Sequence, residues 1–223
     1  MPKPSIRNHS IVSGNGNSVA LALPSGVLND DALFSFIVLP AGSAFITTPS
    51  GWDFLNEVNL QGSIKARSYR RKANAEPSTY TFPLDSSVDY GAVMIAVKDA
   101  NMNTPFDGNN SQVNINTSSV VAPALTPESP AFILYFGAVN KSATFNPTGG
   151  LTEYLDTILI AGSLSVIVAT EQLTSSGATG SRSSTVSVSG NGAGFLLGVR
   201  PKLIPIDGPK NRGIMRGICR GFS

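Results

Sequence analysis

Two segments of this chain, about one hundred residues apart, carry similar landmarks in the same order. Each begins with an apolar run, residues 33–39 in one and 131–136 in the other. Such self-similarity predicts one supersecondary unit used twice, each copy burying its apolar face against the other. The alternative is chance likeness, because alternating strands resemble one another. The matched landmarks are Phe45 with Phe145, Leu55 with Leu155, Ser63 with Ser163, residues 79–82 with 185–188, and residues 93–98 with 195–200.

The rest of the pattern is that of a β-protein. Runs of β-branched and aromatic residues are separated by Gly, Pro, Asn and Asp clusters, and long helical periodicity is absent. Many short strands predict a two-sheet antiparallel β-sandwich of jelly-roll or immunoglobulin-like type. Gly and Asn predict tight turns at residues 14–17, 109–110 and 190–192. The predicted strands are residues 18–23, 32–39, 52–60, 63–72, 79–84, 91–98, 112–121, 131–139, 151–159, 164–173, 183–188 and 193–200.

Composition limits the class of protein. With 223 residues the chain can bury one sizeable core, and only 13% of its residues are charged. Ser, Thr, Asn and Gly fill surface positions instead, which is typical of stable extracellular or particle-bound β-proteins. No apolar stretch approaches the roughly 20 residues that cross a bilayer, and the N-terminus lacks the apolar core of a secretory signal. We therefore expect the chain to fold in the cytoplasm. Cys219 is the only cysteine, so no internal disulfide can form.

Charge is distributed unevenly along the chain. Six basic residues and one acidic residue lie from Arg200 onward, although the net charge of the whole chain is only +2. Prolines and repeated glycines there disfavour a helix or a central strand, and the apolar content is unsuited to a solvated tail. We predict a lead over residues 1–16, a β-sandwich over 17–200 and a basic extended arm over 201–223; a frayed end is the alternative to the arm. The arm residues predicted to anchor the chain to a partner are Lys202, Leu203, Ile204, Ile206, Lys210, Arg212, Ile214, Arg216, Ile218, Arg220 and Phe222.

Catalytic and metal-binding chemistry finds little support in the sequence. His9 is the only histidine, which leaves no histidine-based metal site and no base for a serine triad. Carboxylate pairs such as Asp30 with Asp31 exist, but nothing sets them across a cleft. Residues 99–103 resemble the start of a calcium loop, yet Thr104 stands where the turn glycine belongs. We predict no enzymatic activity, no cofactor and no metal site.

A basic run, Arg70-Arg71-Lys72, could suggest contact with nucleic acid. On a strand, however, consecutive side chains point to alternate faces, and three such residues make a poor phosphate track. We therefore expect no direct contact with nucleic acid.

The single tryptophan, Trp52, follows Pro49 and Gly51. The simplest interpretation is a turn in which Gly51 frees the backbone and the indole plugs one end of the sandwich. The alternative is a glycan-facing surface formed by Trp52 and Tyr80. A lone tryptophan is more often buried, so we predict the structural role.

Several ordered segments resemble a β-sandwich family that is common among tailed-bacteriophage proteins and large bacterial surface proteins. The resemblance covers residues 17–201 and rests on the order of its landmarks rather than on one diagnostic motif. Members of this family usually have no assigned activity. Here the family domain stands nearly alone, followed by the basic arm. The segments that carry the resemblance are TPSGW at 48–52, AEPSTYTF at 75–82, GAVMIAV at 91–97, GGLTE at 149–153, GATGSR at 177–182 and AGFLLGVRP at 193–201.

The resemblance implies a structural protein of a tailed-phage virion, made in the cytoplasm of a bacterial host. With the arms, it suggests a decoration or cement protein that binds the major capsid protein or other virion subunits and forms a homo-oligomer, for which we expect a trimer. Neither a membrane nor nucleic acid is an expected partner. One alternative is a tail-associated adaptor or receptor-binding protein that recognises host surface glycan. A free carbohydrate-binding module is another.

Overall fold

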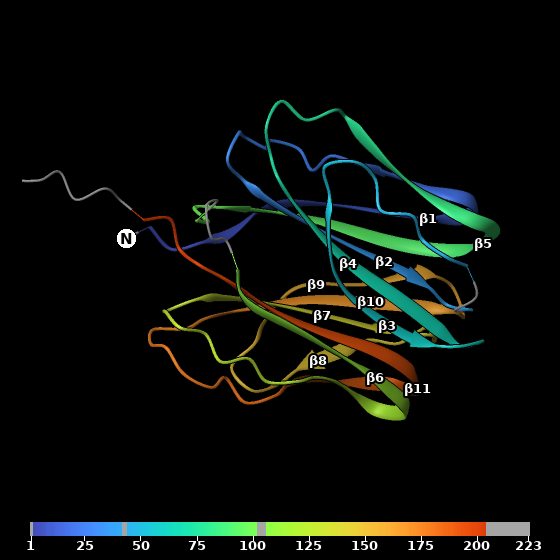
Figure 1. The fold of residues 1–223 in the computed structure, drawn as a ribbon. Coiled ribbons are helices and arrows are strands. Elements are labelled where there is room, and N and C mark those ends of the chain that lie inside the picture. The colour runs from blue at the N-terminus through green and yellow to red at the C-terminus, as the bar shows by residue number, and fades with distance from the viewer. Residues whose placement is uncertain (1, 42–43, 102–105, 204–223) are drawn as a thin grey trace, which may run out of the picture.

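The computed structural model describes residues 2–41, 44–101 and 106–203 (Figure 1). Within these ranges the chain forms eleven β-strands and no helix. The strands are β1 (Ser5–Ala22), β2 (Ala32–Leu39), β3 (Asp53–Leu60), β4 (Ile64–Lys72), β5 (Thr79–Lys98), β6 (Phe106–Ala122), β7 (Phe132–Val139), β8 (Phe145–Pro147), β9 (Thr152–Ile160), β10 (Leu164–Gln172) and β11 (Arg182–Val199).

The strands form two antiparallel sheets that pack face to face (Figure 1). The first half supplies one sheet, in the order β1-β5-β2-β4-β3, and the second half supplies the other, in the order β6-β11-β7-β10-β9. Each strand of the first half has a counterpart in the second: β1 corresponds to β6, β2 to β7, β3 to β9, β4 to β10 and β5 to β11. Replacing each strand of the first order by its counterpart gives the second order. The predicted β-sandwich is therefore confirmed, and its two halves share one strand order.

Residues of the two halves also correspond position by position. Phe36 of β2 lies opposite Ser68 of β4, and Phe136 of β7 lies opposite Val168 of β10. The residues of β2 and β7, and likewise those of β4 and β10, therefore correspond at a spacing of 100 residues. On their other sides Phe36 lies opposite Val93 and Phe136 opposite Phe195, which gives a spacing of 102 between β5 and β11. The predicted correspondence of residues 93–98 with 195–200 is confirmed.

Three of the other matches are out of register. Asn56 lies opposite Ser68 as Leu155 lies opposite Val168, so the predicted match of Leu55 with Leu155 is wrong by one residue. Ile46 forms a bridge with Leu84 and is buried, just as Phe145 pairs with Val186 and is buried. The counterpart of Phe145 is therefore Ile46, and the predicted match with Phe45 is wrong by one residue. Because Leu84 corresponds to Val186, residues 79–82 are not the counterparts of 185–188.

Both faces of each sheet are buried. The main core lies between the sheets and includes Phe36 and Phe136, while each outer face is covered by loops and strand ends of its own half. Tyr69 and Tyr135 belong to these outer cores, and both are fully buried. Strands β2 and β7 are buried at every position. Burial on two faces explains why their sequences are continuous apolar runs rather than alternating ones.

The predicted N-terminal lead and tight turns are wrong. From Ser5 onward the lead belongs to β1, which pairs with β5, so it is an edge strand of the sandwich. Residues 14–16 lie in β1 beside a register shift, and residues 190–192 lie in β11 beside another. Residues 109–110 lie within β6. Here glycine serves irregular strands rather than hairpins, because it allows the local bend of a bulge.

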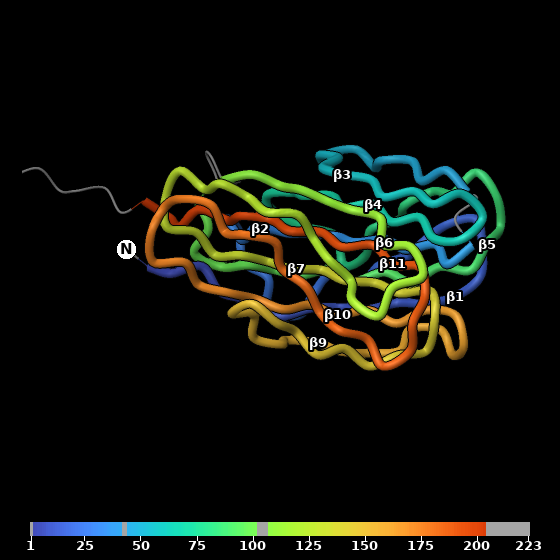
Figure 2. Tube along the Cα trace, turned by 90° about the horizontal axis from the view of Figure 1, so that it is seen from below, coloured from blue at the N-terminus to red at the C-terminus, as the bar shows by residue number. Residues whose placement is uncertain are grey.

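The strands β3 and β9 are edge strands at equivalent ends of the two strand orders, and β1 and β6 are the edge strands at the other ends. They lie on opposite sides of the molecule when it is viewed from below (Figure 2). The glycines of their tight turns, Gly62 after β3 and Gly162 after β9, have φ angles of 73° and 81°. The two hairpins β3–β4 and β9–β10 are therefore equivalent in place and in turn geometry.

Candidate functional site

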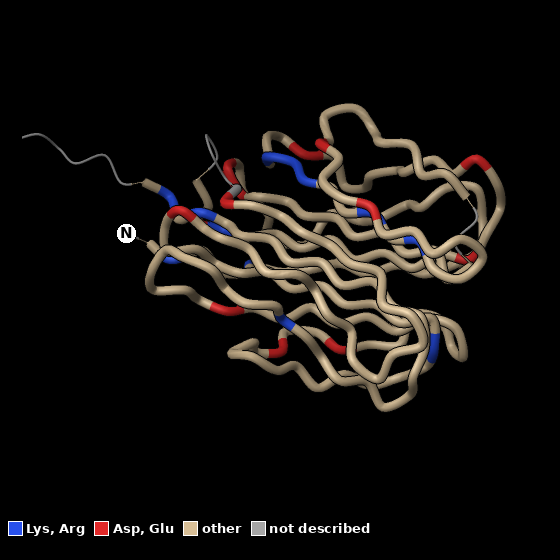
Figure 3. Tube along the Cα trace, turned by 60° about the horizontal axis from the view of Figure 1, so that its bottom comes forward, with Lys and Arg blue, Asp and Glu red and all other residues tan. Residues whose placement is uncertain are grey.

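The root of the predicted C-terminal arm, residues 200–202, is fixed to residues 99–101 of the segment that links the two halves. After β11 the chain runs antiparallel to this linking segment. The Lys202 amide donates a hydrogen bond to the Asp99 carbonyl (2.7 Å), and the Asn101 amide donates one to the Arg200 carbonyl (2.9 Å). Residues of both charges lie at this end of the molecule, as they do elsewhere, and the N-terminus lies here too (Figure 3). The arm therefore starts from a fixed point at one end of the sandwich.

Ion pairs hold the last side chain before the arm. The Arg200 guanidinium lies 2.7 Å from Asp107 and 2.9 Å from Glu128. Burial opposes ionisation of Asp107, but hydrogen bonds from the Glu128 amide, from Arg200 and from Ser129 outweigh it and hold the pKa of Asp107 below its ordinary value. Asp107 thus joins the start of β6 to the end of β11.

Only the first two of the predicted anchoring residues lie in the described part of the chain. Lys202 and Leu203 are both exposed, Leu203 by 66%. The residues that lie outside the described ranges are Ile204, Ile206, Lys210, Arg212, Ile214, Arg216, Ile218, Arg220 and Phe222.

The two residues considered as glycan-facing are buried. Trp52 is 5% exposed and Tyr80 is 8% exposed, and their rings meet edge to face with centroids 5.1 Å apart. The Trp52 amide donates to the Pro49 carbonyl (3.2 Å), and Gly51 has a φ angle of 78°. The predicted turn with a buried indole is confirmed. The glycan-facing role of both rings is wrong, because the outer core of the first sheet covers them.

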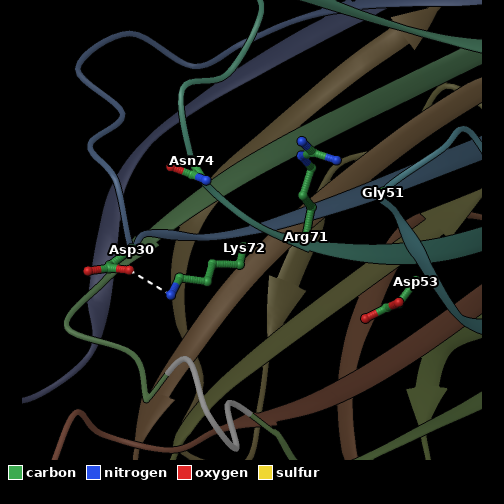
Figure 4. Close-up of a pocket in the computed structure, with 6 residues that line it drawn as sticks. All are labelled: Asp30, Gly51, Asp53, Arg71, Lys72 and Asn74. Carbon is green, nitrogen blue, oxygen red and sulfur yellow. Dashed lines mark ion pairs between the residues drawn. The ribbon is translucent and has the colours of Figure 1, made fainter.

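A polar pocket of about 530 Å³ lies beside this turn (Figure 4). Lys72 reaches across it to Asp30, 2.8 Å away. The Arg71 guanidinium lies 2.7 Å from the carboxylate of Glu76, a residue that does not line the pocket. The pocket therefore offers hydrogen-bonding groups whose charges are already paired. It is lined by Asp30, Gly51, Asp53, Arg71, Lys72 and Asn74.

An exposed aromatic surface lies beside the β3–β4 hairpin. The Arg67 guanidinium is 4.4 Å from the centroid of the Phe45 ring and 5.3 Å from that of Phe54. Phe45 is 50% exposed and Phe54 is 48% exposed. Arg67 is itself held by an ion pair with Glu57. Aromatic rings beside an arginine are enriched at the centres of protein interfaces. We call Phe45, Phe54 and Arg67 the β3 face.

No family model matches the chain, and no curated protein is significantly similar to it. The likeness to the tailed-phage β-sandwich family stays a prediction that rests on ordered landmarks.

His9, which falls within the predicted lead of residues 1–16, is part of β1. Its Nδ1 lies 3.1 Å from the Tyr154 hydroxyl of β9, so it joins edge strands of the two sheets. Among the residues that the structure describes, no group of three or more His, Cys, Asp or Glu could hold a metal ion. The described ranges also contain no helix long and apolar enough to cross a membrane.

The sequence interpretation missed the β3 face. Part of a signal was available in the repeat, because at a spacing of 100 the second half has Ile167 where the first has Arg67. Only the strand pairing shows that Phe54 lies where the second half has Glu153, since counting at a spacing of 100 matches Phe54 with Tyr154. A cation and an aromatic ring that have no counterpart in the equivalent half are not required by the shared fold. Exposure of the phenylalanines could not be deduced, since this residue type is usually buried.

Proposed function

We propose that this chain is a structural protein of a tailed-phage virion, a decoration protein that binds the assembled head and stabilises it. Its partners are the major capsid protein or other virion subunits, which it reaches through the C-terminal arm. A protein that binds the assembled lattice but not the separate subunits stabilises the lattice by mass action.

The observation that carries the proposal is the fixed root of a basic arm. Backbone pairing with the linking segment and the ion pairs of Arg200 hold this root at one end of a rigid sandwich. Residues 204–223 then contain four basic residues and one acidic residue. A tethered segment of this kind adds contact area across subunits and attracts an acidic surface.

The proposal assigns no catalytic role to the protein. Carboxylates with little exposure act as structural partners, since the buried Asp31 is held by Arg7 at 2.6 Å and the partly buried Glu171 by Arg182 at 2.7 Å. The buried Trp52 also favours a structural protein over one that stacks sugars on an exposed indole.

A second candidate function is a tail-associated adaptor or receptor-binding protein that recognises host glycan. The polar pocket beside Gly51 favours it, because Asp, Asn, Arg and Lys side chains converge there from separate segments. In this case the arm attaches the chain to the tail and the pocket faces the host.

A sedimentation assay tests the proposal. Undecorated heads and isolated tails are each mixed with the full chain, with a chain that lacks residues 204–223, and with a full-length control in which Lys210, Arg212, Arg216 and Arg220 become glutamine. We expect the full chain to sediment with heads, the deletion to stay in solution, and the control to bind more weakly and with less dependence on salt. Binding to tails alone, or glycan binding that survives the deletion, favours the second candidate.

A further inference from the structure

Two equivalent hairpins of this protein carry opposite charge. The hairpin β3–β4 has five basic residues, all on β4, and two acidic ones, both on β3. The equivalent hairpin β9–β10 has three acidic residues, Glu153, Asp156 and Glu171, and no basic one. The repeated fold places these hairpins at opposite sides of the molecule (Figure 2). Ion pairs offset part of this charge: the five cations of β4 lie against the four carboxylates of Glu57, Asp53, Glu76 and Asp30, and Glu171 is paired with Arg182. The side at β3–β4 therefore keeps a small positive excess where its counterpart keeps a negative one.

Both hairpins also expose large apolar side chains. The β3 face has Phe45 and Phe54, each about half exposed. The strand β9 has Ile158, which is 50% exposed, and the exposed Glu153, which lie opposite Ser165 and Ala169 and so share one face of the strand. Tyr154 is 38% exposed, but it contacts His9 of β1 instead. We call Glu153 and Ile158 the β9 face. Clustered apolar groups with charged neighbours are typical of interaction sites rather than of inert surface.

Comparing equivalent positions of the two halves shows which residues the shared fold requires. Glu153 opposes Ala169 on β10 just as Phe54 opposes Tyr69 on β4, so the fold accepts a glutamate where the first half has a phenylalanine. The same comparison places Ile167 at the position of Arg67. The shared fold therefore does not require a phenylalanine at position 54, and an exposed Phe54 is consistent with selection for contact with a partner. Arg67 also has a structural role, because it pairs with Glu57 and donates a hydrogen bond to the Ile46 carbonyl.

We propose that the β3 face binds the β9 face of a second copy of this chain, giving a head-to-tail homo-oligomer. Contact between two β3 faces would bring arginines and lysines of β4 against their own copies, which like-charge repulsion disfavours. Contact between unlike faces instead brings the cations of β4 toward Glu153. Since the two faces lie on opposite sides, each copy keeps one face free for the next. A repeated contact of this kind closes into a ring when its rotation allows.

The proposal does not depend on the virion role, because the purified chain alone tests it. Sedimentation equilibrium over a range of protein concentrations, with Cys219→Ser as the background, gives the mass of the assembly. We expect a discrete oligomer that dissociates as salt is raised, since screening weakens the charge contribution. Deleting residues 204–223 should leave it intact. A monomeric background protein, or an oligomer that needs those residues, overturns the proposal.

Two single substitutions then identify the faces. Phe54→Glu introduces the residue that the second half carries at this position, and Glu153→Lys reverses the charge of the β9 face. Each should give a monomer, while Ile115→Ser, at a 65% exposed site on β6, should leave the oligomer unchanged. Unfolding curves show whether the variants keep the fold.

A mixture of the two variants separates a head-to-tail contact from a symmetric one. The Phe54→Glu chain retains its β9 face and the Glu153→Lys chain retains its β3 face, so one contact remains between them. We expect a one-to-one dimer that grows no further. No association in the mixture, or oligomers that both variants retain, overturns the proposal. If the background protein is monomeric and Phe54→Glu loses head binding, the β3 face binds the shell instead of a second copy.

Discussion

Phe36 and Phe136 stack on each other across the two sheets, with ring centroids 4.3 Å apart and planes inclined by 10°. They are equivalent residues of the two halves, at the same place in β2 and β7. Phe195 packs against both rings, with its centroid 6.0 Å from each. The centre of the core is therefore the point at which one copy of the repeat meets the other.

Truncating either ring should strongly destabilise the fold. Phe36→Ala and Phe136→Ala each remove a side chain that is at most 1% exposed, leaving a cavity between rigid sheets. We expect each substitution to lower the free energy of unfolding by about 3–5 kcal/mol. Urea unfolding monitored by far-ultraviolet circular dichroism measures the loss.

The double substitution tests the stacking contact. Because the two rings share one cavity, its cost should be smaller than the sum of the single costs. Ile115→Ala, at an exposed site, is the control and should change the free energy of unfolding by less than about 0.5 kcal/mol. Strict additivity of the two phenylalanine substitutions would show that the rings do not depend on each other.

The sequence allowed the sandwich and its two halves to be predicted because inward-facing residues recur at nearly constant spacing. Phe36 and Phe136, for example, can be matched by counting alone. The glycine clusters could not be assigned so easily. Glycine occupies both hairpin turns and bulged strands, and only the pairing of β1 with β5 shows that Gly14 and Gly16 belong to a strand.

Gly194 should not tolerate a methyl group. A Cβ built there would lie 2.2 Å from the Val121 carbonyl oxygen, which is backbone and cannot move aside easily. We expect Gly194→Ala to cost about 3 kcal/mol, at the upper end for overpacking. Gly16→Ala is a matched control in another long strand, because the nearest atom to its Cβ is 3.9 Å away. Thermal unfolding compares the two, and equal melting temperatures would contradict the prediction.

The fluorescence of Trp52 should report a buried ring. It is the only tryptophan, and the outer core of the first sheet covers it. We expect emission at short wavelength, weak quenching by iodide, and no change when glycans are added. Gly51→Ala should raise the quenching, since Gly51 has a φ angle of 78° and its Cβ would meet Arg71. Strong quenching of the unmodified protein would restore the glycan-facing interpretation.

The candidate sites were less predictable than the fold. Composition identified the basic arm, because charge and proline content can be counted. The β3 face depends on exposure, and exposure depends on which residues the distant second sheet and the outer loops cover. Even so, the absence of an arginine at Ile167 is visible once the halves are aligned at a spacing of 100. The absence of an aromatic ring at Glu153 needs the strand pairing, because the spacing of 100 matches Phe54 with Tyr154.

Acid should weaken both the fold and the root of the arm through Asp107. The unfolded chain titrates this carboxyl at its ordinary pKa of 3.8, and the folded chain titrates it lower. Folding therefore gains stability from the ionised Asp107 above pH 3.8, and this gain is lost as the pH falls through the folded pKa. Asp107→Asn should cost about 1–3 kcal/mol near neutral pH, because Arg200 loses its charged partner. The difference from the unmodified protein should shrink on acidification, and Arg200→Met should behave in the same way. Melting temperatures measured between pH 2 and 7 test this, and a difference that does not vary with pH would show that Asp107 does not contribute through its charge.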